Sequence, residues 1–575
     1  MRAGVRAGVH VQGGGPPFSA PLPPREGAYA IPKYISLWPM AQTATSIVVR
    51  CLVTVLRIMS LSHMPNNPRV CKTPDDSFEW PAHACERLRE LGLHEIIEVA
   101  IKCHKGVCTT SATCAGVMTA ETAARAAGHP LGLAVKLVWV TEKSVACIRE
   151  ILCQPCGDQP RHLYRNQAHM LQPDVWEKLN TIPLEEPLAR EELIMSKPTR
   201  KNAPCLICTK NCGKETACEV ARTDLHTGGT PCVDDSRFGK QKKDKGKFRW
   251  VTITFIRQRM DLKEPFFVSE NAPEQGMNLF VKYLSELYEL QRVVISPSKQ
   301  GYKNRRWRQY IIGKLKALNL PVPSCLQCEQ LPLHAIMETI FMRSAAYSYC
   351  EYACATEENV KEELEWSRKR PGVVERYAKM QDPAYHDEDH VWKAALTQAE
   401  RENLEDLSTD ANLTDCSYDL GQRRVRLMAS HKDSDMHTLT HSMGILWCSV
   451  LDRWFVVDEL CIMMGFPVLR KYAALLGSDC SFTHGAGTNT FRTRHSCLAQ
   501  VGNAMHMASI GATLMSIFLF YFPYLNRINA IQNLQCKRDR GEDDDSETED
   551  YNKKRPAPKS LVDISRFDVI NFLRM

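Results

Sequence analysis

The order of apolar and polar positions predicts an α/β fold from about residue 95 onward. Short β-rich runs alternate with helix-like patterns at 120–127, 135–140, 266–269, 277–290 and 310–313. Strands that alternate with helices are typical of a mostly parallel sheet covered by helices. In such sheets the functional side chains lie at the carboxyl ends of the strands, and Glu142 and Glu270 both stand at such ends.

Changes in this pattern divide the chain into five predicted segments. They are a basic N-terminal segment at 1–94, an α/β lobe at 95–313, a region of charged helices at 314–449, a return to the lobe at 450–530 and a charged tail at 531–575. The fold class that we expect is therefore a Rossmann-like α/β lobe with a smaller inserted domain.

Both ends of the chain carry patterns that fit targeting segments or, alternatively, disordered leaders and tails. Residues 1–74 are basic and hold one acidic residue, Glu26, which fits an organelle transit segment. The acidic block 541–550 lies between basic clusters at 537–538 and 553–556, which fits a nuclear import signal. We expect a nuclear protein, with an organelle as the alternative.

Composition narrows the function classes without choosing one. Hydrophobic residues make up 44% and charged residues 24% of the chain, as in ordinary soluble proteins. The net charge of +7 is compatible with a nucleic-acid partner and equally with plain solubility. The apolar stretch 47–61 is interrupted by arginines, and 514–524 is too short to span a bilayer, so we expect no membrane partner. The 24 cysteines, without an evident secretory signal, indicate reduced thiols or metal ligands.

Two segments carry side chains suited to acid and nucleophilic catalysis. Pro231 and Cys232 follow two glycines on a predicted exposed turn, where a thiol with a lowered pKa acts as a nucleophile. Glu270 closes a buried apolar strand and precedes Asn271. Desolvation there raises the pKa of a carboxyl group and suits it to donate a proton. Taken alone, an incidental turn cysteine and a solvated strand-end glutamate are the plainer interpretations.

A basic segment follows at 304–309. If it is a strand, Asn304, Arg306 and Arg308 share one face and the intervening residues share the other. Two arginines on one face suit contacts to a phosphate or a base. A basic edge strand without such contacts is the alternative.

In this order the three segments resemble the motifs of the cytosine-5 DNA methyltransferases, which are a Pro-Cys loop, a Glu-Asn-Val and a Gln-x-Arg-x-Arg. Five other segments are similar to further motifs of that family: the glycine loop at 113–121, the acidic strand end at 140–142, the adenine-site segment at 162–167, the Gly-Phe-Pro motif that ends 453–467 and the Gln-x-Gly-Asn motif at 500–504. The resemblance covers roughly 95–315 and 450–520.

The resemblance implies an enzyme that uses S-adenosyl-L-methionine to methylate carbon 5 of a cytosine flipped out of duplex DNA. It makes Cys232 the nucleophile, Glu270 the acid at ring nitrogen 3, and region 314–449 the target-recognition domain. Arg306 and Arg308 would hold the nucleotide, and Asn271 would position the Pro-Cys loop. The implied cofactor residues are Cys114, Gly116, Glu142, Asn166, Pro231 and Asn503.

The sequence departs from the family pattern at several positions. Val233, Ala272 and Asn304 replace the usual Gln, Val and Gln of the three catalytic motifs. Met118 stands at a glycine of the cofactor loop, where a side chain would crowd the cofactor, and Asn166 stands where the family has Asp. These two changes support the alternative of a catalytically weakened DNA-binding relative. The same chemistry on RNA is a second alternative, although the Cys-Phe-Thr signature of the transfer-RNA branch is absent from the sequence.

A group of cysteines precedes the Pro-Cys loop. Cys205, Cys208, Cys212 and Cys218 are candidate zinc ligands, but the spacing lacks paired knuckles and reduced thiols are the preferred interpretation. Weaker candidates are the pairs at 153 and 156 and at 325 and 328, and the polar segment 385–390.

Overall fold

The computed structural model describes residues 69–103, 106–154, 158–235, 242, 245–318, 333–375, 391–422, 429–440, 443–477, 500–523 and 525. All of these residues belong to one compact unit, which spans residues 50–575. The predicted transit segment up to residue 68 and the charged tail lie outside the described residues. So do Cys156, Cys325, Cys328 and the polar segment 385–390.

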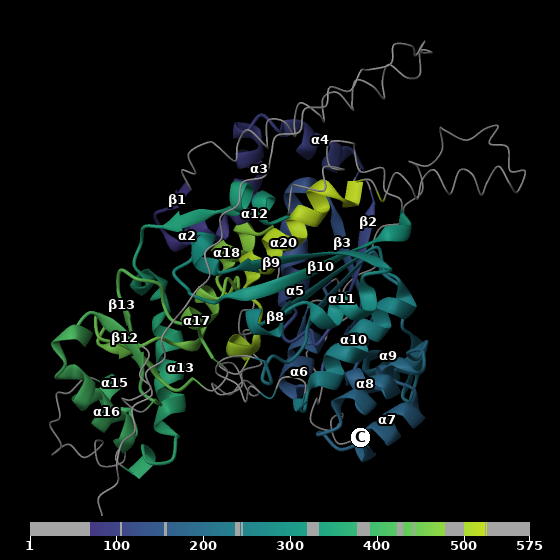
Figure 1. The fold of residues 1–575 in the computed structure, drawn as a ribbon. Helices are drawn as coiled ribbons and strands as arrows, with labels where there is room; N and C mark the ends of the chain where they lie inside the picture. Colours follow the sequence, from purple (N-terminus) through teal and green to yellow (C-terminus); the bar gives the residue numbers. More distant parts are fainter. Residues whose placement is uncertain are drawn as a thin grey trace, which may run out of the picture. The chain divides into compact units, whose positions relative to one another are not determined.

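A seven-stranded sheet forms the centre of the described fold (Figure 1). In spatial order its strands are β4 (His162–Tyr164), β3 (Ala134–Thr141), β2 (Val107–Thr113), β7 (Leu225–Gly229), β8 (Phe266–Asn271), β10 (Arg308–Leu315) and β9 (Tyr288–Ile295). The pairs from β4 to β8 are parallel, and β10 runs antiparallel to β8 and β9. The chain order reverses between β2 and β7, which is where α/β sheets bind ligands. This topology confirms the predicted Rossmann-like α/β class.

Alternating side chains of the central strands supply two hydrophobic cores on opposite faces of the sheet. Phe266 and Val268 of β8 pack into the first core, and Phe267 packs into the second. Because both faces of β8 are covered, all of its residues are buried. The helices of the first core are α3 (Trp80–Glu90), α4 (His94–Cys103), α5 (Thr119–Gly128), α12 (Leu333–Phe341) and α20 (Met507–Phe520). Those on the second side are α7 (Pro173–Thr181), α8 (Pro187–Met195), α10 (Arg249–Leu262) and α11 (Asn278–Leu284).

Residues 69–94 belong to this fold, so the predicted boundary at residue 94 does not match the structure. Strand β1 (Arg69–Cys71) pairs in parallel with β11 (Arg343–Ala345). At the end of α2 (Pro74–Phe78), the ring of Phe78 stacks on Tyr472 of α18 (Arg470–Leu475) with centroids 4.0 Å apart. The basic composition of the preceding residues concealed this boundary, because the anchoring contacts are made to segments far away in the sequence.

A smaller group of elements lies within the predicted inserted region and just beyond it. Its antiparallel sheet has the order β13 (Ala429–His431), β12 (Cys416–Asp419), β14 (Leu446–Cys448) and β15 (Arg453–Trp454). The helices α13 (Glu357–Arg368), α15 (Val391–Ala394) and α16 (Gln398–Ser408) accompany this sheet, and the chain then enters α17 (Val457–Met463). A separate core that contains Leu364, Leu404, Trp447 and Trp454 stabilises the group.

One predicted helix ends early in the structure, and one apolar stretch forms a core helix. The pattern at 277–290 forms α11 only as far as Leu284, and the residues from Tyr288 onward form β9. Apolar residues spaced for a helix are followed there by a β-rich run that pairs with β10. The stretch Gln500–Phe520 is long and apolar enough to cross a membrane by length and composition alone, but 94% of it is buried within the fold. Its helix α20 packs on α5, as a core element does.

Candidate active site

A pocket opens at the carboxyl ends of β2, β7 and β8. Strand register places Thr113 beside Gly228, and Gly229 beside Glu270, so the ends of the three strands meet at one edge. The pocket is lined by Ala112, Thr113, Cys114, Ala115, Gly116, Thr119, Ala120, Glu121, Thr227, Gly229, Glu270, Asn503, Ala504 and Met505. Three predicted cofactor residues, Cys114, Gly116 and Asn503, therefore come together with the predicted acid Glu270.

Glu142 anchors the glycine loop that forms one wall of this pocket. Its Oε2 accepts a hydrogen bond from the Gly116 amide at 2.7 Å, and its Oε1 accepts from the amides of Lys143 and Ser144 at 2.8 and 2.7 Å. Burial raises the pKa of this carboxyl group, and the three amide donors oppose that effect. Glu142 thus follows β3, as the sequence predicted, and ties the loop after β2 to the end of β3.

Met118 does not crowd the pocket, although the sequence raised that concern. Its side chain is 2% exposed and packs beneath the loop with Leu137, Val140 and Ile148. Its backbone has φ +62°, the left-handed conformation that favours glycine, at the start of α5. The departure from glycine therefore costs backbone strain of about 1–2 kcal/mol, and the side chain is not among those that line the pocket.

Three predicted cofactor residues lie outside the pocket lining, namely Glu142, described above, Asn166 and Pro231. The Oδ1 atom of Asn166 accepts a hydrogen bond from the Ala168 amide at 3.1 Å and so caps the short helix Gln167–Met170. Pro231 stands beside Cys232 on the loop after β7 and is half-buried. Their contacts to a cofactor stay predictions.

Cys232 lies half-buried on the loop after β7, among charged side chains from neighbouring strands. Burial raises the pKa of its thiol, and the carboxyl group of Glu270 adds to that rise. The guanidinium groups of Arg308 and Arg306 act in the opposite direction, because they stabilise the thiolate. The structure therefore brings the predicted nucleophile, acid and arginines into one electrostatic site.

Glu270 pairs with Arg308 at this site. Arg308 Nε is 3.0 Å from Glu270 Oε1, and both side chains are largely buried. Burial raises the pKa of Glu270 above its ordinary value, although Arg308 and Arg306 oppose the shift. A buried carboxyl group with a raised pKa is better suited than an exposed one to donate a proton in a hydrogen bond.

Asn271 holds the loop that carries Cys232. Its Nδ2 donates to the backbone oxygen of Thr230 at 2.9 Å and to the Thr230 hydroxyl at 3.0 Å. Thr252 of α10 donates a further hydrogen bond to the same hydroxyl at 3.1 Å. Beyond the cysteine, Asp234 accepts from the Phe248 amide at 2.8 Å. The thiol therefore sits on a loop that is fastened on both sides.

Arg306 and Asn304 hold distant segments of the chain together. Arg306 is 2% exposed and donates to three backbone oxygens, those of Leu439 at 3.0 Å, Gly502 at 3.0 Å and Ala504 at 2.7 Å. Asn304 donates to the backbone oxygen of Met463 at 3.2 Å. The segment is a strand only from Arg308, where β10 begins, so the expected strand at 304–309 is partly wrong. Arg305 and Trp307 are exposed as expected for the other face, but Gln309 is buried. Arg306 is a positioning residue in this arrangement, and its predicted contact with a nucleotide stays a prediction.

Glu121 is a pocket residue that sequence reasoning did not single out. It is 3% exposed, and its Oε2 has no hydrogen-bond partner among the described residues. Its other oxygen accepts from Thr227 at 3.5 Å, and burial raises the pKa of the carboxyl group to about 7. An acidic residue in the first turn of a helix is ordinary in a sequence, so only the tertiary structure reveals its place in the pocket.

The cysteine group is arranged differently from the predicted set. Cys205, Cys208 and Cys218 come together, but Cys212 is exposed at the end of its helix and His162 takes the fourth place. His162 comes from β4, and its distance in sequence from the cysteines concealed it.

Comparisons with known proteins find weak similarities to solved structures. No family model matches the chain, and no curated protein matches it. Among solved structures, Entamoeba histolytica methyltransferase EhMeth is 12% identical with a TM-score of 0.38, S. pombe Dnmt2 methyltransferase is 11% identical with 0.36, and a mutant of Spodoptera frugiperda DNMT2 is 14% identical with 0.32. Each covers 72% of this chain, and the chain covers 98%, 98% and 99% of them, respectively. The assignment of the fold rests on the strand order and the two cores, since these scores are too low to support it.

Proposed function

We propose that this protein transfers a methyl group from S-adenosyl-L-methionine to carbon 5 of cytosine in DNA, with Cys232 as the covalent nucleophile. The observation that carries the proposal is Glu270, which forms a wall of the pocket and also acts on the thiol of Cys232. The pocket, Glu270 and Cys232 lie at one edge of the sheet, and this arrangement supports methyl transfer to a base.

The pocket has features that fit the cofactor. Its glycine loop is held by Glu142, whose carboxylate follows β3 at the position where dinucleotide-type folds hold a ribose. The free Oε2 of Glu121 offers a buried anionic partner for the positive charge of the cofactor. Gly229 keeps the wall open, since a Cβ there would lie 2.9 Å from Met505 Cε. When bound, S-adenosylmethionine supplies an electrophilic methyl group.

The protein's own groups account for the remaining chemistry. The thiolate of Cys232 adds to carbon 6 of cytosine and forms a sulfur–carbon bond. A proton on Glu270 hydrogen-bonds ring nitrogen 3 and draws electron density into the ring, while Arg308 holds the carboxyl group in place. Once the methyl group has left the sulfonium sulfur and bonded to carbon 5, carbon 5 loses its proton to solvent water, the bond between Cys232 sulfur and carbon 6 breaks, and the thiolate is restored.

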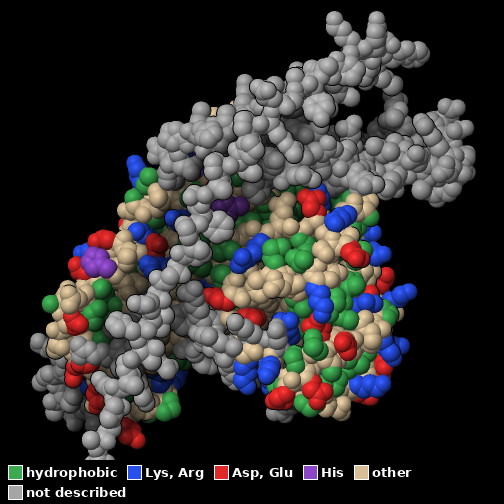
Figure 2. Space-filling view, in the orientation of Figure 1, with side chains coloured by type: hydrophobic (Ala, Val, Ile, Leu, Met, Phe, Trp, Pro, Cys, Tyr) green, Lys and Arg blue, Asp and Glu red, His purple; other side chains and the backbone are tan. Residues whose placement is uncertain are grey.

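DNA is the proposed substrate, with RNA as the alternative that uses the same chemistry. A base inside a duplex cannot reach the thiol of Cys232, so the proposal requires base flipping. Figure 2 shows basic and acidic side chains interspersed over α7 to α11, so the charges on that face do not indicate where the nucleic acid binds. The preference for DNA rests on the motif pattern of the sequence.

Covalent trapping tests the proposal. The full chain is incubated with S-adenosylmethionine and duplex DNA that carries 5-fluorocytosine, whose fluorine cannot leave as a proton does. We expect an adduct that survives denaturing electrophoresis with the wild type and no adduct with Cys232→Ser. A matched control, Cys212→Ser, alters an exposed cysteine and should leave the adduct unchanged.

Three other outcomes separate the alternatives. An adduct on an RNA oligonucleotide and none on DNA would show that RNA is the substrate of the same reaction. Normal DNA binding without any adduct would point to the catalytically weakened relative. An adduct that persists in Cys232→Ser would refute the assignment of the nucleophile.

A further inference from the structure

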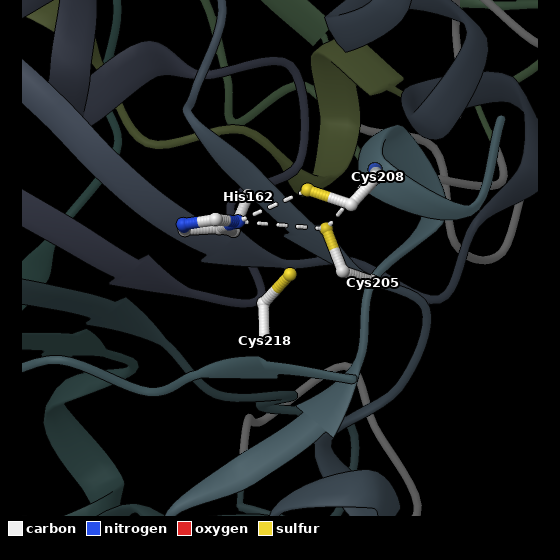
Figure 3. Close-up of side chains that lie close together, drawn as sticks. All are labelled: His162, Cys205, Cys208 and Cys218. Carbon is white, nitrogen blue, oxygen red and sulfur yellow. Dashed lines mark hydrogen bonds between the residues drawn. The ribbon is translucent and has the colours of Figure 1, made fainter. Parts of the chain in front are cut away.

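A second group of reactive side chains lies at the opposite edge of the sheet from β9. His162 is the first residue of the edge strand β4, Cys205 and Cys208 flank the start of α9 (Leu206–Cys212), and Cys218 lies in β6 (Ala217–Glu219). Figure 3 shows the imidazole of His162 and the three sulfur atoms turned toward one common point. The proposed methyl transfer uses none of these groups.

We propose that His162, Cys205, Cys208 and Cys218 form a structural zinc site. The four ligand atoms all lie within 4.8 Å of one another. His162 Nδ1 is 3.7 Å from Cys205 Sγ and 3.5 Å from Cys208 Sγ. Zinc bonds of about 2.3 Å to sulfur and 2.0 Å to nitrogen place tetrahedral ligands about 3.5 Å apart for a nitrogen–sulfur pair and about 3.8 Å apart for two sulfurs, so these separations leave room for one ion.

The donor set selects zinc among the common metals. Three thiolates and one imidazole are the ligands of closed structural zinc sites, and they leave no open position for a substrate. The Cys208 amide lies 3.5 Å from Cys205 Sγ and donates to it, an outer contact that stabilises a metal-bound thiolate. All three cysteines are free thiols, so no disulfide competes for them in this structure.

The backbone around the site explains what the metal would stabilise. Strand β5 (Asn202–Pro204) and β6 form a two-stranded hairpin in which Ala203 pairs with Cys218. A single bridge joins Tyr164 of β4 to Cys205, and the Tyr164 hydroxyl donates to the Glu219 backbone oxygen at 2.7 Å. So small a hairpin has little core of its own, and small units of this kind gain stability from a metal. The ion would fasten the hairpin and α9 to the edge of the sheet, directly before the strand that leads to Cys232.

Metal analysis of the purified full chain tests the proposal. Protein expressed with added zinc should contain about one zinc ion per chain after dialysis. Cys208→Ser and His162→Ala should each lose most of this zinc. Cys212→Ser is the matched control, since Cys212 lies on the same helix outside the cluster, and it should keep the full zinc content.

Cobalt provides a measurement that does not depend on the folding of the variants. Wild-type protein stripped of metal and titrated with Co²⁺ should show the intense visible absorption of a tetrahedral site, with sulfur-to-metal charge-transfer bands, saturating at about one equivalent. Cys212→Ser should give the same spectrum.

Two results would overturn the proposal. One is folded wild-type protein with far less than one zinc ion per chain and no tetrahedral cobalt spectrum. The other is loss of zinc in Cys212→Ser together with its retention in His162→Ala, which would favour the four-cysteine set that the sequence offered as a weaker candidate.

Discussion

Arg308 and Glu270 form an ion pair at the mouth of the candidate active site, with Nε of the arginine 3.0 Å from Oε1 of the glutamate. The pair joins β10 to β8 and lies close enough to Cys232 to change the pKa of its thiol. Its two members act on that thiol in opposite directions, since Glu270 raises the pKa and Arg308 lowers it. The charge of the pair therefore governs both the acid and the nucleophile of the proposed reaction.

Replacing Arg308 by Met should slow methyl transfer and move its pH profile to higher pH. The positive charge of Arg308 lowers the pKa of Glu270 and the pKa of Cys232, so both pKa values rise when that charge is removed. The acid then keeps its proton to higher pH, and the thiolate forms only at higher pH. We expect kcat to fall by about 100-fold, the scale for removing one preorganised charge.

The measurement is kcat/KM as a function of pH. Arg308→Lys keeps the positive charge and serves as the control, with a smaller shift of the profile. An Arg308→Met profile that coincides with the wild type, whatever the rate, would contradict the electrostatic role.

Asn271→Ala should loosen the Cys232 loop. The substitution removes both hydrogen bonds to Thr230 and leaves the backbone oxygen of that residue buried without this donor. The expected cost is about 1–3 kcal/mol in the free energy of unfolding, with a larger loss in adduct formation than in cofactor affinity. Asn180→Ala is the control, because its amide is exposed on α7 and bonds only its own helix. Denaturant unfolding and 5-fluorocytosine trapping measure the two effects. Equal stability of the two variants would argue against the loop anchor.

The adjacent glycines of β7 should respond differently to alanine. A Cβ at Gly228 would lie 2.4 Å from the Phe255 ring in the core, so Gly228→Ala should destabilise the fold by about 1–3 kcal/mol. A Cβ at Gly229 would lie 2.9 Å from the flexible end of Met505 and would enter the pocket. Gly229→Ala should therefore weaken cofactor binding with little loss of stability.

Calorimetric binding of S-adenosylmethionine and thermal unfolding separate these outcomes. Adding Phe255→Leu should restore part of the stability of Gly228→Ala and none of the affinity lost by Gly229→Ala. Loss of affinity in Gly228→Ala and loss of stability in Gly229→Ala would show that the cofactor does not bind beside Gly229.

Met118→Gly should not improve cofactor binding, although glycine is the residue of the family pattern. The substitution relieves left-handed backbone strain of about 1–2 kcal/mol but removes a buried side chain, which costs about 2–5 kcal/mol. The net expectation is a loss of stability, measured by denaturant unfolding, with unchanged affinity for the cofactor. Tighter binding by Met118→Gly would show that the methionine does intrude on the pocket.

Glu121 should make both stability and cofactor binding depend on pH near neutrality. Its pKa in the folded state, about 7, lies above the ordinary glutamate value, so the folded state holds the proton more tightly. The stabilisation is complete below the unfolded pKa and is lost as pH rises through about 7. Glu121→Gln should escape that loss, worth about 3 kcal/mol at alkaline pH.

Cofactor binding should show the opposite trend. The carboxylate that forms above pH 7 attracts a cation, so wild-type affinity for S-adenosylmethionine should rise with pH, and the affinity of Glu121→Gln should stay flat. Binding measured at pH 6 and pH 8 distinguishes the two proteins. Parallel curves would remove Glu121 from the site.

Sequence patterns predicted a feature correctly where the residues that indicate it lie within one strand or helix. The apolar run FFVS placed β8 and put Glu270 near its carboxyl end. The strand expected around Arg306 begins only at Arg308. The helix expected at 277–290 was partly wrong, because pairing with β10 turned its second half into β9. Helix and strand patterns overlap in short apolar runs, and the partner strand decides between them.

The sequence by itself determined the order of the motifs, the class of the fold and the identity of the candidate nucleophile, acid and arginine. Only the tertiary structure decided which side chains meet. In the folded chain Met118 packs in the core, and Arg306 donates hydrogen bonds to three backbone oxygens. Glu121 lines the pocket, and His162, rather than Cys212, lies beside Cys205. The physical reason is that periodicity depends on neighbours along the chain, whereas a site depends on contacts between strands and loops that packing alone brings together.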